Sequence, residues 1–256
     1  MTRSDAARPS PAGHGDARDA REVTAPARDP RVGEVAVSLV RRAVLPGVVA
    51  AILLWAVGWM IMNPWDKIPA EEGINAWFAS LRTPTGDAIT HVWSTSTDTF
   101  FAIGFGIVSS LLVWALTRRW WLGILPIGAI TLESSIFVPV TNILGRPRPL
   151  VEHLDAAPPT SSYPSGHTAA AFALYVTLFL LARRIPQRWL RTLVQALCLL
   201  WPCLVAIARL YRGMHHVSDV LMGMVLGVWC AFVIVRAVPG AWEFTRRTLP
   251  VTRAPT

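Results

Sequence analysis

The chain has 256 residues, of which 53% are hydrophobic and only 16% are charged, and its mean hydropathy is +0.42. This composition excludes an ordinary water-soluble domain, which needs a charged surface, and indicates a membrane protein. The formal net charge of +8 does not indicate nucleic-acid binding, because the cations lie between long apolar runs and not in a patch on a soluble surface.

Residues 1–35 are rich in Pro, Ala, Arg and Asp and almost free of aromatic residues. Such a segment cannot bury enough apolar surface to fold, so we expect a disordered tail. It lacks the apolar core and cleavage site of a secretory signal, so we expect the first apolar run, which begins near Ala43, to remain as an anchor. The predicted organisation is a tail at 1–35, a membrane domain at 36–240 and a C-terminal tail at 241–256.

Apolar runs dominate the rest of the sequence. A helix needs about 20 apolar residues to cross a bilayer, and only helices satisfy every backbone polar group in lipid at this length. The sequence predicts an all-α, polytopic bundle of six transmembrane helices, at roughly 43–62, 99–117, 121–141, 168–183, 190–210 and 217–238. Internal prolines predict kinks at Pro126, Pro139 and Pro202. Residues 69–93 mix apolar and polar residues at helical spacing, which predicts an amphipathic helix at the membrane interface.

Most of the 24 Lys and Arg residues fall on the side of the two termini. The opposite side holds only Lys67, Arg82, Arg146, Arg148, Arg209 and Arg212. Because cations concentrate in cytoplasmic loops, this distribution predicts cytoplasmic termini in a cell membrane. Three polar segments then share the extracytoplasmic face and can converge there, namely TNILGRPRPL (141–150), SYPSGHT (162–168) and ARLYRGMHHVSDV (208–220).

Two of these segments carry histidines suited to phosphate chemistry. Ser165, Gly166 and His167 precede the fourth span, where free N–H groups of a helix start attract an anion and His167 can protonate a leaving group. The same residues could instead form an ordinary turn and helix cap. His215 and Asp219 are four residues apart, so we expect them on one helix face, with Asp219 accepting the Nδ1 proton and Nε2 free to attack phosphorus.

A helix-capping pair, or a metal site that includes His216, is the alternative for these two residues. Neighbouring residues point about 100° apart on a helix, which disfavours shared metal ligation. The cysteines lie within apolar runs and do not indicate a metal or redox cluster. We therefore expect neither a metal nor a cofactor.

Four arginines accompany the histidines. Arg148 and Arg209 offer planar guanidinium groups that can hold phosphate oxygens in a bidentate manner. Arg146 and Arg212 can assist, although contact with lipid head groups or a helix-end role would explain them equally well. Glu133 lies within the third span, where a structural hydrogen bond to a neighbouring helix is its simplest role.

Together the three segments resemble the type 2 phosphatidic acid phosphatase and vanadium haloperoxidase superfamily, whose motifs are Lys-x6-Arg-Pro, Pro-Ser-Gly-His and Ser-Arg-x5-His-x3-Asp. The resemblance covers approximately residues 95–235. It implies that His215 is the nucleophile, that Asp219 orients it, and that His167 protonates the leaving alkoxide without a metal. It further implies a phosphate site formed by Arg148, Arg209, Ser165 and Gly166.

Two positions depart from the family motifs. Thr141 stands in place of the first Lys, and Ala208 stands in place of the Ser of the third motif. We expect Arg146 or Arg212 to compensate for the missing cation.

The sequence therefore predicts an integral membrane lipid phosphatase with a phosphohistidine intermediate. Its substrate would be a phosphomonoester or pyrophosphate such as phosphatidate, phosphatidylglycerol phosphate or an isoprenyl pyrophosphate. The apolar spans disfavour the soluble haloperoxidase branch. A lipid phosphotransferase and a catalytically weak lipid-binding relative are the alternatives. The expected partners are a lipid phosphate and the bilayer, without nucleic acid, and no motif indicates an oligomeric state.

Overall fold

The computed structural model describes residues 29–63 and 69–246, and every regular element in these two ranges is a helix. The first span is a continuous helix from Val32 to Met62. It consists of α2 (Val32–Leu39), a π-helical segment η1 (Val40–Val44) and α3 (Leu45–Met62).

The other helices follow without any intervening strand in the described ranges. They are α4 (Pro69–Ser80), α5 (Pro84–Thr95), α6 (Thr99–Thr117), α7 (Trp120–Leu144), α8 (Gly166–Ala182), α9 (Arg188–Tyr211), α10 (Val217–Ala237) and α11 (Ala241–Arg246). Five spans are long and apolar enough to cross a membrane, and α8, with 17 residues, is a shorter apolar helix. The predicted all-α bundle of six transmembrane helices is confirmed, so the chain is a multi-pass membrane protein.

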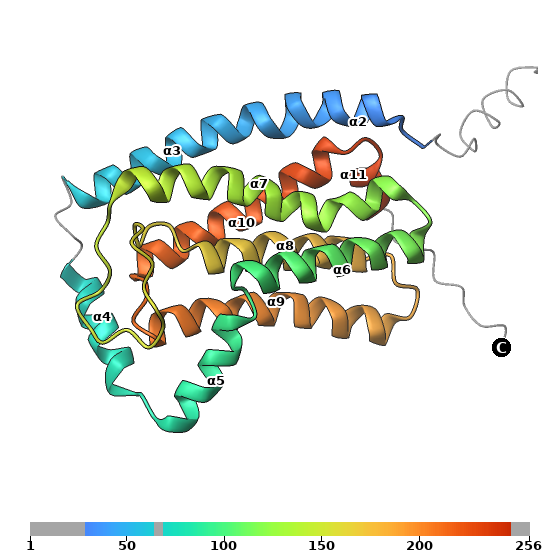
Figure 1. Ribbon diagram of the computed structural model, residues 1–256. Coiled ribbons are helices and arrows are strands. Elements are labelled where there is room, and N and C mark those ends of the chain that lie inside the picture. The colour runs from blue at the N-terminus through green and yellow to red at the C-terminus, as the bar shows by residue number, and fades with distance from the viewer. Residues whose placement is uncertain (1–28, 64–68, 247–256) are drawn as a thin grey trace, which may run out of the picture.

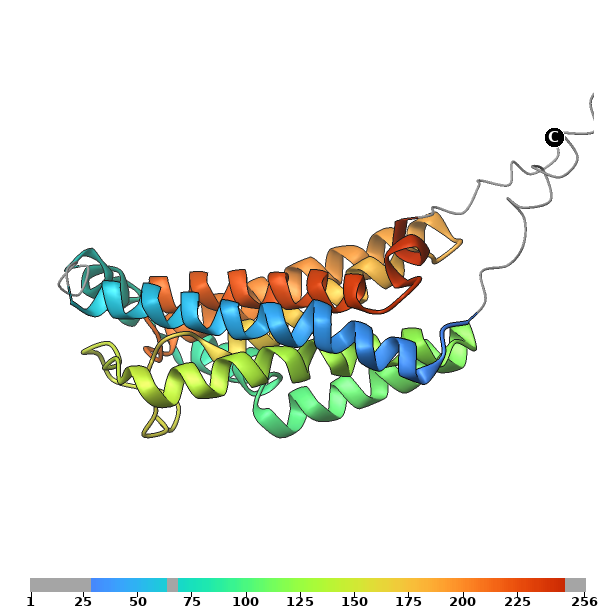
Figure 2. The same cartoon turned by 90° about the horizontal axis from the view of Figure 1, so that it is seen from above.

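The six spans lie side by side in an elongated bundle (Figures 1 and 2). At one end, α4 and α5 lie beside the long connection between α7 and α8 and beside the start of α10. The start of α2 and the short helix α11 lie at the opposite end. The three polar segments identified in the sequence therefore meet at a single end of the bundle.

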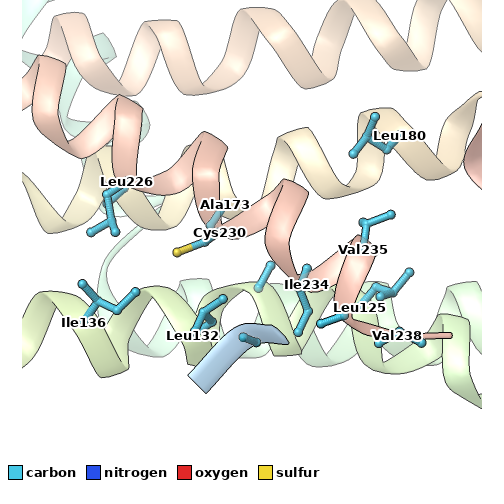
Figure 3. Close-up of a cluster of buried hydrophobic side chains, with 14 of the residues drawn as sticks. Leu125, Leu132, Ile136, Ala173, Leu180, Leu226, Cys230, Ile234, Val235 and Val238 are labelled. Atoms are coloured by element: carbon cyan, nitrogen blue, oxygen red, sulfur yellow. The ribbon is translucent and has the colours of Figure 1, made fainter. Parts of the chain in front are cut away.

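The centre of the bundle is formed by α7, α8 and α10 (Figure 3). Small residues let α8 and α10 approach closely, as in many membrane helix pairs. A Cβ atom added to Gly223 would lie 2.5 Å from the carbonyl oxygen of Ser165, and one added to Gly227 would collide with the carbonyl oxygen of Ala169. This contact fixes the start of α10, with Asp219, against the start of α8.

Three boundaries differ from the predictions. Helix α2 begins inside the expected N-terminal tail, whose residues 1–28 lie outside the described ranges. The expected C-terminal tail begins with α11, and its residues 247–256 are likewise not described. The single amphipathic helix predicted at 69–93 is two helices, because Thr83 caps a new one. Its Oγ1 accepts a hydrogen bond from the Gly86 N–H at 3.0 Å, and Pro84 takes the first helical position.

Candidate active site

A cavity of about 660 Å³ lies at the end of the bundle where the polar segments meet. Its walls come from α5, α6, α7, the connection between α7 and α8, the start of α8 and the end of α9. Five of the predicted site residues line it, namely Arg148, Gly166, His167, Arg209 and His215. The other four, Arg146, Ser165, Arg212 and Asp219, do not belong to its lining.

His215 lies in the connection before α10 and not on the helix, because α10 begins at Val217. The expectation that His215 and Asp219 share a helix face is therefore wrong. The Nδ1 atom of His215 is 2.7 Å from the carbonyl oxygen of Ser162 and 3.8 Å from Oδ2 of Asp219. The backbone carbonyl, and not the carboxylate, is thus the nearer partner of this ring nitrogen.

The protonation state of His215 follows from this environment. Burial lowers the pKa of His215 to about 4, with Arg209 acting in the same direction and Asp219 opposing it. The imidazole is therefore neutral at pH 7. A carbonyl oxygen can only accept, so Nδ1 carries the proton and Nε2 keeps its lone pair. This is the tautomer that a nitrogen nucleophile requires.

Asp219 is fully buried and serves as a hub for the groups around the start of α10. Its Oδ2 accepts a hydrogen bond from the His216 N–H at 2.8 Å, and its Oδ1 pairs with Nη1 of Arg146. Asp219 can therefore stabilise positive charge on the neighbouring ring of His215, although it caps the helix at the same time.

Arg148 and Arg209 retain hydrogen-bonding capacity. Arg148 donates from Nη1 to the carbonyl oxygen of Met214 at 2.8 Å, and Arg209 donates from Nη1 to Oδ2 of Asp155 at 2.9 Å. The Nε atom of each guanidinium is buried and has no partner in the described part of the chain. Buried donors normally find an acceptor, so an anion in the cavity is a chemically suitable partner for both.

Arg146 is held by protein carboxylates. Its Nη2 donates to Oε2 of Glu71 at 2.7 Å, and its Nη1 contacts Asp219 and the Oγ of Ser218. The expectation that Arg146 replaces the missing cation is not supported, because its guanidinium is committed to this network outside the cavity.

Arg212 is committed in the same way. It donates from Nε to Oδ1 of Asp155 at 2.8 Å, from Nη2 to the carbonyl oxygen of Leu154 at 2.8 Å, and from Nη1 to that of Asp87 at 3.0 Å. Although burial acts in the opposite direction, Arg212 and Arg209 hold the pKa of Asp155 below its usual value. Arg212 therefore anchors the loop and α5 and does not supply the missing cation.

His167 has a partner that the sequence analysis missed. Its Nε2 is 2.7 Å from Oδ1 of Asp98, the residue that precedes α6. A carboxylate at this distance orients the imidazole ring, and it can stabilise the positive charge of the ring while the ring holds the proton of a general acid. The only sequence signal for Asp98 was a carboxylate placed directly before an apolar span.

The backbone before α8 is less free than expected. The Ser165 N–H donates to the carbonyl oxygen of Asp219 at 3.0 Å, and the Ser165 Oγ pairs with Oγ1 of Thr168 at 2.9 Å. The predicted phosphate contact through Ser165 is therefore not available in this structure. Gly166 does border the cavity, and a Cβ atom there would lie 2.6 Å from the ring of Phe137.

The two departures from the family motifs have different settings. Thr141 borders the cavity, and its Oγ1 donates to the carbonyl oxygen of Ser161 at 3.1 Å. Ala208 is fully buried in α9 and does not line the cavity. Glu133 also borders the cavity. Within the described residues its carboxyl group accepts a hydrogen bond from Ser134 of the same helix, and not from a neighbouring helix as expected.

The fold and this cavity define a helical, multi-pass membrane protein with histidine and arginine side chains gathered at one end of its bundle. The family model of the PAP2 superfamily matches residues 122–243, which include every predicted site residue. The resemblance to this superfamily that the sequence motifs indicated is therefore confirmed.

Known proteins resemble the chain to different extents. An undecaprenyl-diphosphatase of Sulfolobus acidocaldarius is 34% identical over 83 residues, which are 32% of this chain and 36% of the relative. The chain therefore matches about a third of that relative's length.

Two solved structures share the fold. A transmembrane PAP2 type phosphatidylglycerolphosphate phosphatase from Bacillus subtilis aligns with a TM-score of 0.64 and 21% identity, covering 73% of this chain and 92% of that one. Aquifex aeolicus LpxE aligns with a TM-score of 0.53 and 20% identity, covering 67% of this chain and 98% of that one.

Proposed function

We propose that this protein is an integral membrane lipid phosphatase that cleaves a phosphomonoester or pyrophosphate through a phosphohistidine intermediate. The proposal rests on the protonation state and the surroundings of His215. Its Nδ1 donates to a backbone carbonyl, and the ring borders a cavity that also contains Arg148 and Arg209. A neutral imidazole with a free Nε2 beside two guanidinium groups is suited to attack on phosphorus. The relatives named above as phosphatases support the same chemistry.

The first step forms a covalent intermediate on His215. Its Nε2 attacks phosphorus, a P–N bond forms, and the P–O bond to the lipid oxygen breaks. His167 donates its proton to that oxygen as it leaves. The ring of His215 becomes positively charged, and Asp219, whose Oδ2 lies 3.8 Å from Nδ1, stabilises that charge.

The second step regenerates the enzyme. His167, now neutral, takes a proton from water as the water oxygen attacks phosphorus. The P–N bond breaks, phosphate leaves, and both histidines return to their starting states. Arg148 and Arg209 hold the phosphate oxygens in both steps, because charge builds up on these oxygens in each transition state.

We also infer that the bilayer presents the substrate and that the site faces the extracytoplasmic side. A group of arginines lies at the end of the bundle opposite the cavity, namely Arg118 and Arg119 between α6 and α7, Arg183 and Arg184 after α8, Arg188 and Arg191 at the start of α9, and Arg236 near the end of α10. Such an end usually faces the cytoplasm. The cavity end would then face outward.

Phosphate release by detergent-purified protein tests the function. We expect release from at least one of phosphatidate, phosphatidylglycerol phosphate and an isoprenyl pyrophosphate in the presence of EDTA. In His215→Ala, release should vanish, because the nucleophile is gone. His153→Ala is the matched control, since the ring of His153 lies 3.0 Å from the carbonyl oxygen of Pro149 and does not line the cavity. Acid-labile labelling of His215 by radioactive substrate would identify the intermediate.

Three other outcomes of this experiment would lead to different conclusions about the function. Full release by His215→Ala would refute the phosphohistidine mechanism. Transfer of phosphate to an added alcohol without release to water would identify a phosphotransferase. Folded wild-type protein that binds lipid phosphates but transforms none would identify a lipid-binding relative.

A further inference from the structure

The cavity extends from the histidines toward the interior of the bundle. Its deeper wall includes Ala102 and Ile103 of α6, Ile130 and Phe137 of α7 and Ala170 of α8. These side chains are apolar, in contrast to the histidines and arginines of the upper part. A lipid phosphate held at His215 would therefore place the part of the lipid next to its phosphate against this wall.

One ionisable side chain interrupts the deeper wall. Glu133 lies on α7 eight residues before Thr141, which corresponds to about 12 Å along a helix axis. It borders the same cavity, yet only 1% of its surface is exposed. The ring of Phe137, one helical turn above Glu133, lies against Gly166 of the predicted phosphate site. Glu133 thus lies about 6 Å below that site along the helix axis, at the depth of the group that connects phosphate to the lipid chains.

Only one of the two carboxyl oxygens of Glu133 has a hydrogen-bond partner in the described residues. Its Oε2 accepts a hydrogen bond from the Ser134 Oγ at 3.1 Å, whereas Oε1 is buried without a partner in the described residues. Burying an unpaired carboxylate is costly, which favours the neutral acid, and a neutral carboxyl group can donate one hydrogen bond. Ser134 belongs to the same helix, so this contact does not explain Glu133 as a link between helices.

The candidate lipids differ in the region that Glu133 would meet. A glycerolipid phosphate carries ester carbonyls and, in some head groups, hydroxyls within a few bonds of its phosphate. An isoprenyl phosphate carries only hydrocarbon there. A hydrocarbon chain would leave the buried oxygen unpaired, whereas a carbonyl or hydroxyl would pair with it.

We propose that Glu133 hydrogen-bonds to a carbonyl or hydroxyl group near the phosphate of the substrate, and that the protein selects glycerolipid phosphates over isoprenyl phosphates. This inference rests on the proposed function, because it assumes that the phosphate binds at His215.

A second groove of about 410 Å³ lies beside the cavity and shares Ile103, Ile130 and Ser134 with it. The rest of its lining consists of Ile127, Thr131 and Ser135. The groove therefore offers room for a lipid chain between α6 and α7.

The ratio of kcat/KM for phosphatidate to that for an isoprenyl phosphate tests the inference. We expect wild-type protein to prefer phosphatidate and Glu133→Leu to lower the ratio by about tenfold or more, since leucine cannot hydrogen-bond. Glu133→Gln should keep the ratio within about threefold of wild type, because an amide still donates. Glu243→Leu, a change of an exposed glutamate on α11 at the opposite end of the bundle, should leave it unchanged.

Binding separates this inference from the proposed function. The same lipids are titrated against His215→Ala and against the double variant His215→Ala/Glu133→Leu, so that no turnover is needed. Selective phosphatidate binding that weakens in the double variant supports Glu133 even if no lipid is hydrolysed. A wild-type preference for the isoprenyl phosphate, or an unchanged ratio in a folded Glu133→Leu protein, would overturn the inference.

Discussion

His215 and His167 border the same cavity, but their partners prepare them for opposite roles. His215 is buried beside a backbone carbonyl, so it is neutral and offers a lone pair. His167 contacts the carboxylate of Asp98, which orients the ring and can stabilise its positive charge when a proton is bound. The residue type was readable from the sequence in both cases. The role of each depends on which oxygen atom lies beside its ring.

Asp98→Asn tests the role assigned to His167. An amide does not stabilise the imidazolium, so the rate with an alkyl phosphate should fall by roughly 10- to 100-fold, which does not exceed the lower limit of the about 10²–10⁴-fold that general-acid catalysis contributes. An aryl phosphate needs little proton donation to its leaving group, so its rate should change by less than about threefold. Steady-state kinetics with both substrates measure the difference.

The control for this experiment is Asp87→Asn, whose carboxylate accepts from the hydroxyl of Tyr211 at 3.1 Å and does not line the cavity. Equal losses with alkyl and aryl substrates in Asp98→Asn would assign Asp98 to folding or phosphate binding and not to proton transfer.

At the scale of elements, buried ion pairs join the connection between α7 and α8 to its neighbours. Arg146 of that connection pairs with Glu71 of α4 and with Asp219 of α10. A second set joins Asp155 of the connection to Arg209 and Arg212. Through these pairs, helices that are distant in the sequence hold the loop that carries Arg148 over the cavity.

Arg146→Met should therefore act mainly on stability. It would leave two buried carboxylates without their cation, and breaking a buried ion pair in this way typically costs about 3–5 kcal/mol. We expect a clear fall in the thermal unfolding midpoint in detergent. Adding Glu71→Gln should restore part of the lost thermal stability, because it removes one buried negative charge that no longer has a cation beside it.

Inhibition by inorganic phosphate distinguishes this role from phosphate binding. The inhibition constant should rise in Arg148→Met and stay near the wild-type value in the folded fraction of Arg146→Met. If Arg146→Met instead kept its unfolding midpoint and bound phosphate weakly, Arg146 would be the auxiliary phosphate ligand that the sequence suggested.

At the scale of the whole molecule, the bundle has two chemically different ends. One end carries the cavity and the ion-pair network, and the other carries most of the cationic loops. By the positive-inside rule, this distribution supports our proposal that the cavity faces the extracytoplasmic side.

Cysteine labelling of intact cells tests this orientation. Leu150 is 89% exposed in the connection at the cavity end, and Gln187 is exposed at the opposite end. In a background with the three native cysteines replaced by alanine, Leu150→Cys should react with a membrane-impermeant maleimide. Gln187→Cys should react only after permeabilisation. The reverse pattern would place the site on the cytoplasmic side.

The sequence by itself determined the spans and the chemical groups of this protein. The length of an apolar run decides whether a helix can cross the membrane, and this length is a local property of the sequence. Five of the six spans were therefore predicted within a few residues, whereas the first begins at Val32, eleven residues before its predicted start. The motif spacing also identified His215, His167, Arg148 and Arg209, all of which border the cavity.

Only the tertiary structure decided which of those groups can work together. The sequence assigned Arg146 and Arg212 to phosphate binding and Asp219 to the orientation of His215. In the structure, carboxylates and carbonyls from distant segments bind the two arginines. Asp219 caps α10. Asp98 and Glu133 are candidate functional residues because they line the cavity, Asp98 directly before α6 and Glu133 within α7. Ion-pair partners and cavity walls depend on how helices and loops pack, which the spacing of residues along one chain does not specify.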